Sequence, residues 1–286
     1  MSDYIRQHST RQNFDQNSWC ILSEIEQSIK RKIEAVGKPL KDWDVSINYG
    51  IKTGCNEAFI IDGETKDALI AQDPKSAEII RPILRGKDIK RYGYTFADKW
   101  LIATHNGTDN TPCVNIEHYP AVKAHLDSYY AKIEQREDQG STPYNLRSCA
   151  YWDDFSKQKI IFPNMTKFLP FVFDDSSYLT NQKCFIVVGK NVAFLTAFLN
   201  SSLFKFCFRD SFPELQGGTR ELSKIFFEKL PIIPINDEIN VNFENAVTDI
   251  QSLYTKEKAI KIDGMIFDLY GLSKEERISI GFIEIK

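Results

Sequence analysis

Apolar residues recur at helical spacing in three separate parts of the chain. The first predicts a helix over Ser18–Val36 that is capped by its first residue, and the second predicts a helix over residues 119–138. The third, residues 243–280, predicts a helical C-terminal tail, in which Ser273 and Glu276 have the spacing of a capping box. We therefore expect helices to flank the rest of the fold.

Short runs rich in β-branched and aromatic residues predict strands, because such side chains suit a pleated surface. These runs are residues 45–47, 58–61, 100–103, 159–162, 171–173 and 185–188. Short helices are expected over residues 64–71, 74–80 and 192–199. The combination predicts an α+β fold, with a mixed β-sheet, flanking helices and a helical C-terminal tail.

The segment Ile79–Tyr92 combines apolar and basic residues. It holds five basic residues and one acid between Arg81 and Arg91. Pro82 argues against one continuous helix, and Gly86 allows a turn. Because its isoleucines predict attachment to a core, we interpret the segment as a basic loop that presents Arg and Lys rigidly to a polyanion. The alternative is an ordinary solvated surface loop.

The overall charge confines any anion-binding site to one part of the surface. The formal net charge is −3, which excludes a wholly basic nucleic-acid-binding protein. A second basic run, from Lys30 to Lys41, has five basic residues and Glu34 as its only acid. Its first residues would also suit the C-terminal end of the first predicted helix, where the helix dipole favours cations.

Composition adds expectations about compartment and size. The six cysteines are widely spaced and form no CxxC pair, which favours reduced thiols and a cytoplasmic location. No apolar run approaches the roughly 20 residues that span a bilayer, so no membrane segment is expected. Apolar residues make up 42% of the 286 residues, enough for a sizeable core.

Motifs that catalysis would require are missing. An adenosylmethionine-dependent methyltransferase needs a glycine-rich loop after a strand, and amino methylation of a base needs an Asn/Asp-Pro-Pro-aromatic motif. Neither occurs in the chain. The ExK string at residues 284–286 has no obvious upstream carboxylate partner for a metal nuclease, and the four histidines are dispersed. We expect no catalysis, cofactor or metal in this chain alone.

Several strings, taken together, resemble the TaqI-like C-terminal specificity domain. Residues 50–62 (GIKTGCNEAFIID) are similar to its opening motif, and Ile79–Tyr92, with LRGKDI at its centre, is similar to its second motif. Tyr144 departs from the Trp that relatives often carry, but keeps an aromatic ring. The resemblance covers most of residues 19–280, and further matches are Tyr119-Pro120, 143–147, 159–163, 199–203, Leu230-Pro231 and 262–276.

This resemblance implies the target-recognition part of an adenine-specific DNA methyltransferase or of a fused restriction–modification enzyme, a system of bacterial defence. In that family a separate N-terminal domain binds S-adenosylmethionine and flips the adenine. The chain then needs double-stranded DNA and a methyltransferase catalytic domain, in cis or in trans, as partners. It would comprise a polar leader or linker (1–17), a DNA target-recognition domain (18–240) and a helical C-terminal subdomain (241–286).

Candidate DNA contacts are polar residues expected on loops. Arg and Lys would hold phosphates, Arg would suit guanine, and Asn and Gln would suit adenine. Asp88 is expected to orient a neighbouring Arg or Lys, and Gly217-Gly218 to let main chain approach a groove. The alternative for each candidate is plain solvent exposure. The candidates are Lys52, Thr53, Asn56, Arg85, Lys87, Lys90, Arg91, Asn145, Arg147, Lys167, Gln216, Thr219 and Arg220.

Two other functions stay open at this stage. The chain could be a protein-interaction or specificity subunit whose helices, over residues 18–36 and 243–280, dock a separate methyltransferase or nuclease subunit. It could also be an enzyme with an unrecognised site. Charge reversal within the segment Arg85–Arg91 separates the first two hypotheses, because only DNA binding depends on its positive charge.

Overall fold

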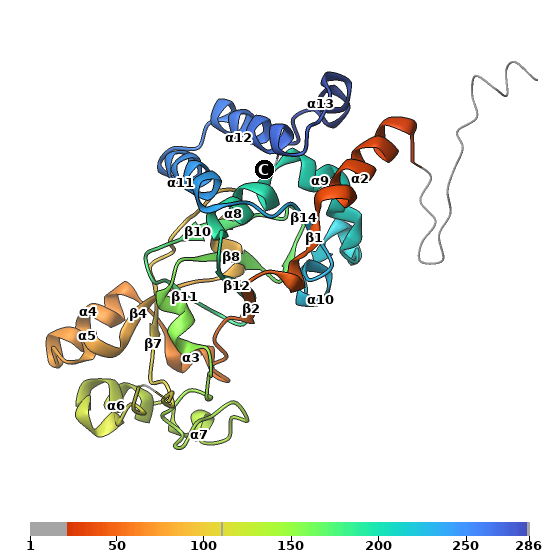
Figure 1. Ribbon diagram of the computed structural model, residues 1–286. Coiled ribbons are helices and arrows are strands. Elements are labelled where there is room, and N and C mark those ends of the chain that lie inside the picture. Colours follow the sequence, from red (N-terminus) through yellow and green to blue (C-terminus); the bar gives the residue numbers. More distant parts are fainter. Residues whose placement is uncertain (1–21, 110, 285–286) are drawn as a thin grey trace, which may run out of the picture.

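Two four-stranded sheets form the centre of the molecule, and helices surround them (Figure 1). The structure is a computed structural model, and it describes residues 22–109 and 111–284. The antiparallel sheet has the strand order β10-β8-β12-β2, and the mixed sheet has the order β11-β4-β7-β3. Three two-stranded sheets, β1-β14, β13-β9 and β5-β6, are added at the periphery. The predicted α+β class with a helical tail is confirmed.

The strands are β1 (Lys38–Pro39), β2 (Val45–Tyr49), β3 (Ile60–Asp62), β4 (Ile80–Leu84), β5 (Ile89–Lys90), β6 (Gly93–Tyr94), β7 (Lys99–Ile102), β8 (Lys159–Pro163), β9 (Met165–Thr166), β10 (Val172–Asp174), β11 (Leu179–Thr180), β12 (Cys184–Gly189), β13 (Arg220–Glu221) and β14 (Pro231–Ile232).

The α-helices are α2 (Glu24–Val36), α3 (Asn56–Phe59), α4 (Gly63–Gln72), α5 (Ser76–Ile79), α6 (Pro120–Asp127), α7 (Tyr130–Ile133), α8 (Val192–Asn200), α9 (Ser202–Phe208), α10 (Lys224–Phe227), α11 (Asp237–Ser252), α12 (Lys256–Leu269) and α13 (Lys274–Ile280). The 3-10 helices are η1 (Leu40–Asp42), η2 (Gly86–Asp88), η3 (Ile116–His118), η4 (Trp152–Ser156), η5 (Arg209–Ser211) and η6 (Gln216–Gly218). None of these helices is both long and apolar enough to cross a membrane.

The antiparallel sheet separates two hydrophobic cores. Side chains alternate between the faces of a strand. In β12, Phe185 and Val187 therefore join one core while Ile186 and Val188 join the other. Strand β8 alternates in the same way, and all five of its residues are buried. Burial on both faces explains why these strands have nearly continuous apolar sequences.

The C-terminal helices complete the first core. Helix α8 is buried along its whole length, and Phe194 and Phe198 of this helix share a core with Phe243, Val247 and other residues of the tail. Figure 1 shows α11 and α12 beside α8, on the side of the sheet away from α4–α7. Apolar residues from both sides of residue 240 thus form one core, while the predicted domain division stays a prediction.

The two ends of the described chain are joined by Glu276. Its carboxylate accepts hydrogen bonds from Lys32 Nζ at 2.7 Å and from Ser28 Oγ at 2.8 Å, which ties α13 to α2. The predicted capping box between Ser273 and Glu276 is confirmed. The attractive contacts of Glu276 outweigh the effect of burial, so the pKa of this carboxyl lies below its usual value.

Three predicted helices or strands have wrong bounds. The first described helix begins at Glu24 and not near residue 18, because Ser23 forms a capping box with Glu26; Ser18 lies outside the described residues. The predicted helix over 119–138 breaks between α6 and α7, where Ser128 Oγ donates to the carbonyl of His125 at 2.6 Å. The run 58–61 is half helical, since α3 occupies its first two residues and β3 its last two.

The segment Ile79–Tyr92 is more regular than the predicted loop. It forms β4, then the 3-10 turn η2, then β5. Pro82 is tolerated within β4 because the neighbouring β11 pairs only with Ile83 and Leu84. The isoleucines of the segment are buried as expected.

Candidate nucleic-acid interface

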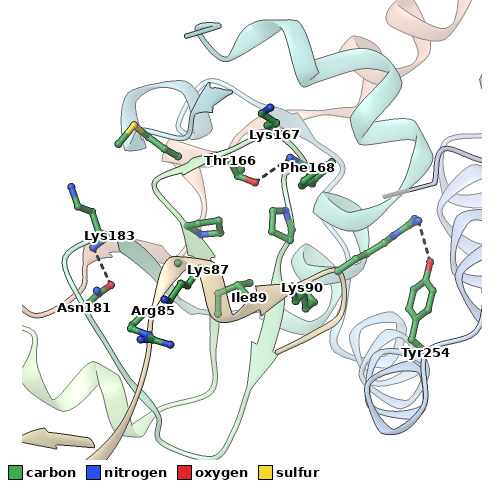
Figure 2. Close-up of a pocket in the computed structure, with 15 residues that line it drawn as sticks. Arg85, Lys87, Ile89, Lys90, Thr166, Lys167, Phe168, Asn181, Lys183 and Tyr254 are labelled. Atoms are coloured by element: carbon green, nitrogen blue, oxygen red, sulfur yellow. Dashed lines mark hydrogen bonds between the residues drawn. The ribbon is translucent and has the colours of Figure 1, made fainter. Parts of the chain in front are cut away.

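A groove of about 920 Å³ runs between the turn after β4 and the segment around β9. We call it the basic groove. Figure 2 shows Lys183 near one end and Tyr254 near the other. Six of the described residues that line it are Arg or Lys, and none of the described lining residues is Asp or Glu. The lining is Arg85, Gly86, Lys87, Ile89, Lys90, Arg91, Pro163, Met165, Thr166, Lys167, Phe168, Pro170, Asn181, Lys183 and Tyr254.

Arg85 builds the turn that forms one wall of the groove. Its Nε and Nη2 donate to the two carboxylate oxygens of Asp88, each at 2.9 Å, and its backbone N–H donates to Oδ2 at 2.9 Å. The hydrogen bond that Arg85 donates to Asp88 also raises the pKa of Arg85 above its ordinary value. Asp88 therefore holds Arg85, as predicted, and balances its charge.

Gly86 lets this turn approach the next segment closely. A Cβ atom at Gly86 would lie 3.2 Å from the carbonyl oxygen of Lys183 and 3.2 Å from Cβ of Pro163. The absence of a side chain at this position brings the turn at Lys87 next to the turn at Asn181–Lys183. Two basic segments that are far apart in sequence thus line the same groove.

Four lysines of the groove are available for an anion. Lys87, Lys90, Lys167 and Lys183 are exposed, and none of them forms an ion pair with a described residue. We call them the groove lysines. Unpaired ammonium groups on one surface create a local positive potential in a chain whose net charge is −3.

Arg91 has a structural role beneath the groove. It is buried, and its guanidinium donates to the carbonyls of Asn200 at 2.8 Å and Ile283 at 3.1 Å and to Tyr254 Oη at 3.5 Å. Of the dashed lines in Figure 2, the one that ends at Tyr254 marks this contact. These bonds connect the basic segment to the tail and leave Arg91 little freedom to meet a ligand.

The loop around Gly217-Gly218 lies beside the groove. Both glycines have left-handed backbone conformations, with φ of 73° and 77°, which other residues adopt only with strain. A second cavity of about 340 Å³ is lined by Gly217, Gly218 and Arg209, and it shares Lys167 and Phe168 with the basic groove.

The three polar candidates of this loop differ in exposure. Gln216 is exposed and Thr219 is partly buried. The side chain of Arg220 is buried and pairs with Asp210 at 2.8 Å and Glu214 at 2.7 Å, so it closes the loop.

The other candidates form a separate cluster around Arg136, which sequence reasoning missed. Its guanidinium donates to the carbonyls of Thr53 at 2.6 Å, Asp138 at 2.7 Å and Pro143 at 2.9 Å, and also to that of Asn145. Burial lowers the pKa of Arg136 to about 10. Three of these carbonyls lie within nine residues of Arg136 and only Thr53 is remote in sequence, yet no periodicity or motif distinguishes this arginine.

The candidates in this cluster differ in exposure, and Lys52, Asn56 and Arg147 are exposed. Thr53 and Asn145 are buried. Thr53 Oγ1 donates to Asn56 Oδ1 at 2.7 Å. Arg147 pairs with Asp138 at 3.1 Å. Lys52 is exposed and follows Ile51, which bridges to Asn181, so it is the candidate of this group nearest to the turn of Lys183.

The second basic run does not line the groove. Lys30 lies 3.8 Å from Glu34, and Lys32 pairs with Glu276. The first of these contacts lies within one helix and the second joins two helices, which agrees with the structural alternative for this run. Within the described residues, no three His, Cys, Asp or Glu side chains gather to hold a metal ion.

Residues 81–232 match the TaqI-like C-terminal specificity domain family. This match covers more than half of the 286 residues. The chain belongs to this family. All described residues that line the basic groove, except Tyr254, lie within residues 81–232.

Two solved structures share the fold of the specificity domain. One is the Type IIL restriction-modification enzyme MmeI in complex with DNA, with a TM-score of 0.59 and 15% identity over 85% of this chain and 35% of that chain. The other is the type IIG restriction endonuclease BpuSI, with a TM-score of 0.52 and 15% identity over 87% of this chain and 34% of that chain. The chain thus spans about a third of each of these enzymes.

Proposed function

We propose that the specificity domain recognises a target sequence in double-stranded DNA and that the basic groove contacts the duplex. The observation that carries the proposal is the groove itself, with its basic residues, its four unpaired lysines and no acid among its described lining. A polyanion is the partner that such a surface favours.

The groove offers groups for positioning and for sequence recognition. The groove lysines would bind phosphates and fix the register of the duplex. Thr166 also lines the groove and is partly exposed, and a hydroxyl group can contact base edges. Gln216 and Lys52 would extend the contact surface beyond the groove. Arg85 and Arg91, which are bound to protein groups, would hold the groove in shape.

Catalysis is assigned to another domain. The chain lacks the glycine-rich and Asn/Asp-Pro-Pro-aromatic motifs that adenine methylation needs. We propose that a methyltransferase domain, in cis or in trans, binds S-adenosylmethionine and acts on the DNA that this domain selects. Two restriction–modification enzymes share this fold over about a third of their length. This supports a separate catalytic domain in addition to the specificity domain.

The protein-docking alternative receives less support from the fold. The helices that would dock a partner, α2 and α11–α13, pack apolar residues into the core of this chain. Ile29 and Ile33 of α2 are buried, as are Val247 of α11 and Ile262 of α12. The same helices also expose Ile260 and Ile278, so our preference for DNA depends on the positive charge of the basic groove.

Selection from a randomised duplex pool tests the function. We expect the chain to enrich one sequence word, since a specificity domain contacts base edges as well as phosphates. A charge-reversal variant, Lys87→Glu, Lys90→Glu, Lys167→Glu and Lys183→Glu, is expected to lose binding and enrichment.

A matched variant controls for net charge. It reverses four exposed lysines outside the groove: Lys38, Lys75, Lys261 and Lys274. It carries the same total charge and is expected to bind as the parent chain does. Equal loss in both variants would show that DNA responds to net charge alone, and enrichment of no word would contradict sequence recognition.

A further inference from the structure

Two large apolar side chains project from the wall of the basic groove. Met165 and Phe168 are 48% and 50% exposed, although both are among the residues that soluble proteins usually bury. They flank Thr166 and Lys167, and both line the groove. In Figure 2 Thr166, Lys167 and Phe168 lie together on the opposite side of the groove from Arg85 and Lys87. The sequence patterns that we considered did not predict this feature.

The turn that carries Phe168 is firmly held. On one side, Thr166 and Met165 pair with Arg220 and Glu221 of β13. Within the turn, the Phe168 N–H donates to Thr166 Oγ1 at 3.1 Å, a bond that Figure 2 marks.

Leu169 anchors the other side of the turn. Its side chain is 1% exposed, and its carbonyl accepts a hydrogen bond from the buried Lys205 Nζ. Leu169 also has a left-handed backbone conformation, with φ of 48°, which costs energy for a residue other than glycine. Such strain is retained where the surrounding structure requires one conformation, and it is common at binding sites. The backbone that carries Phe168 is therefore held in place, which lowers the entropic cost of presenting this side chain to a ligand.

The chemistry of the ring limits what it can contact on a duplex. A phenyl ring has no hydrogen-bond donor or acceptor and gains nothing from a phosphate, whereas lysines beside it attract phosphates. The apolar surfaces of a duplex are the faces of its bases and the thymine methyl groups. On a bound duplex, a half-exposed ring next to Lys167 would therefore contact bases and not phosphates.

We propose that Phe168, supported by Met165, is an apolar wedge that enters the base stack of the bound duplex at one base step. This inference rests on the proposed function. Apolar wedges partly unstack a step and kink the duplex. Because pyrimidine–purine steps unstack most easily, the wedge contributes to target choice without hydrogen bonds, and it favours such a step at the point of insertion.

Fluorescence of 2-aminopurine in the enriched duplex tests the wedge. The probe is placed at successive positions, and its emission rises where a neighbouring base is unstacked. We expect a rise at one step with the parent chain and no rise with Phe168→Ala. Phe168→Ala is also expected to weaken binding on the order of 10-fold while the dependence on salt concentration stays unchanged, because the lost contact carries no charge.

A second variant gives a positive signal. Phe168→Trp keeps an aromatic ring at the turn, and quenching of the new indole on DNA binding is expected if the ring stacks on bases. Tyr49→Ala is the matched control, since Tyr49 is 49% exposed and lies outside the groove. It should leave binding and 2-aminopurine emission unchanged. Thermal melting of each variant separates loss of contact from loss of folding.

Opposite results separate the wedge from the proposed function. If charge reversal of the groove lysines abolishes binding while Phe168→Ala binds normally and still raises 2-aminopurine emission, the groove binds DNA and the wedge is wrong. If charge reversal leaves binding intact, the proposed function itself fails.

A duplex with one mismatched pair gives a further check. It should bind more tightly than the matched duplex to the parent chain, but equally to Phe168→Ala, since the mismatch lowers the unstacking cost.

Discussion

Neutralising the groove lysines should flatten the salt dependence of DNA binding. Each lysine that replaces a counterion on a phosphate contributes about −0.9 to the slope of log affinity against log salt concentration. Four such contacts, from Lys87, Lys90, Lys167 and Lys183, give a slope of about −3.6. Affinity of the parent chain should then fall about 150-fold between about 50 and 200 mM salt.

The variant with glutamine at these four positions keeps side chains of similar length without the charge. Fluorescence anisotropy with a labelled duplex, repeated across a salt series, should give a slope close to zero if these are the main phosphate contacts. Each single substitution should reduce the slope by about 0.9.

The control changes Lys38, Lys75, Lys261 and Lys274 to glutamine and should keep the parent slope. A quadruple groove variant that retains the full slope would refute the assignment of phosphate contacts to these lysines. A slope that falls equally in both variants would assign the effect to net charge.

Three further predictions concern stability and are measured by urea unfolding. Asp88→Ala removes three hydrogen bonds that hold Arg85, and it should cost about 2 kcal/mol at neutral pH; an unchanged midpoint would contradict the support role. Asp174→Asn leaves Lys159 buried without its carboxylate and should cost about 3–5 kcal/mol. Burial already lowers the pKa of Lys159 in the folded protein below 10.5, its value in the unfolded chain. Between these two pKa values the unfolded chain binds one more proton than the folded protein, so the free energy of unfolding should rise as pH rises toward 10.5. This rise should be steeper in the Asp174→Asn variant, which lacks the carboxylate that favours the charged lysine. Glu276→Ala removes the contacts between α2 and α13 and should cost about 1–2 kcal/mol, whereas no loss would show that the two helices pack without it.

Local sequence patterns predicted most of the secondary structure. The strands over residues 159–162 and 185–188 and the helix over 192–199 appear where their apolar runs lie. The helix breaks were harder to predict. Ser128 lies within a helical pattern, and its side chain ends the helix by a bond to the preceding turn. A hydrophobic pattern does not show where a serine side chain competes with backbone N–H groups for a carbonyl of the helix.

The candidate site was predicted in part. The basic segment around Arg85 was found because its charges are close together in the sequence. The bond between Arg136 and Thr53 and the proximity of Lys183 to Lys87 depend on packing between remote segments, which one sequence does not specify. Thr53 and Asn145 were plausible polar candidates, yet both are buried and hydrogen-bonded within the protein. Whether the exposed candidates contact DNA stays a prediction.

Because the two cores share strands β8 and β12, the fold limits which sequence changes can alter DNA specificity during evolution. Residues next to one another in β8 and β12 belong to opposite cores, so neither core can be exchanged for that of a relative without altering the other. Recombination between related chains at a point between these strands would mismatch both cores at once. The exposed turns at Lys87, Lys167 and Lys183 contribute little to either core, and substitutions there leave the interior intact. New DNA specificities should therefore arise by exchange of single groove residues more readily than by exchange of whole segments.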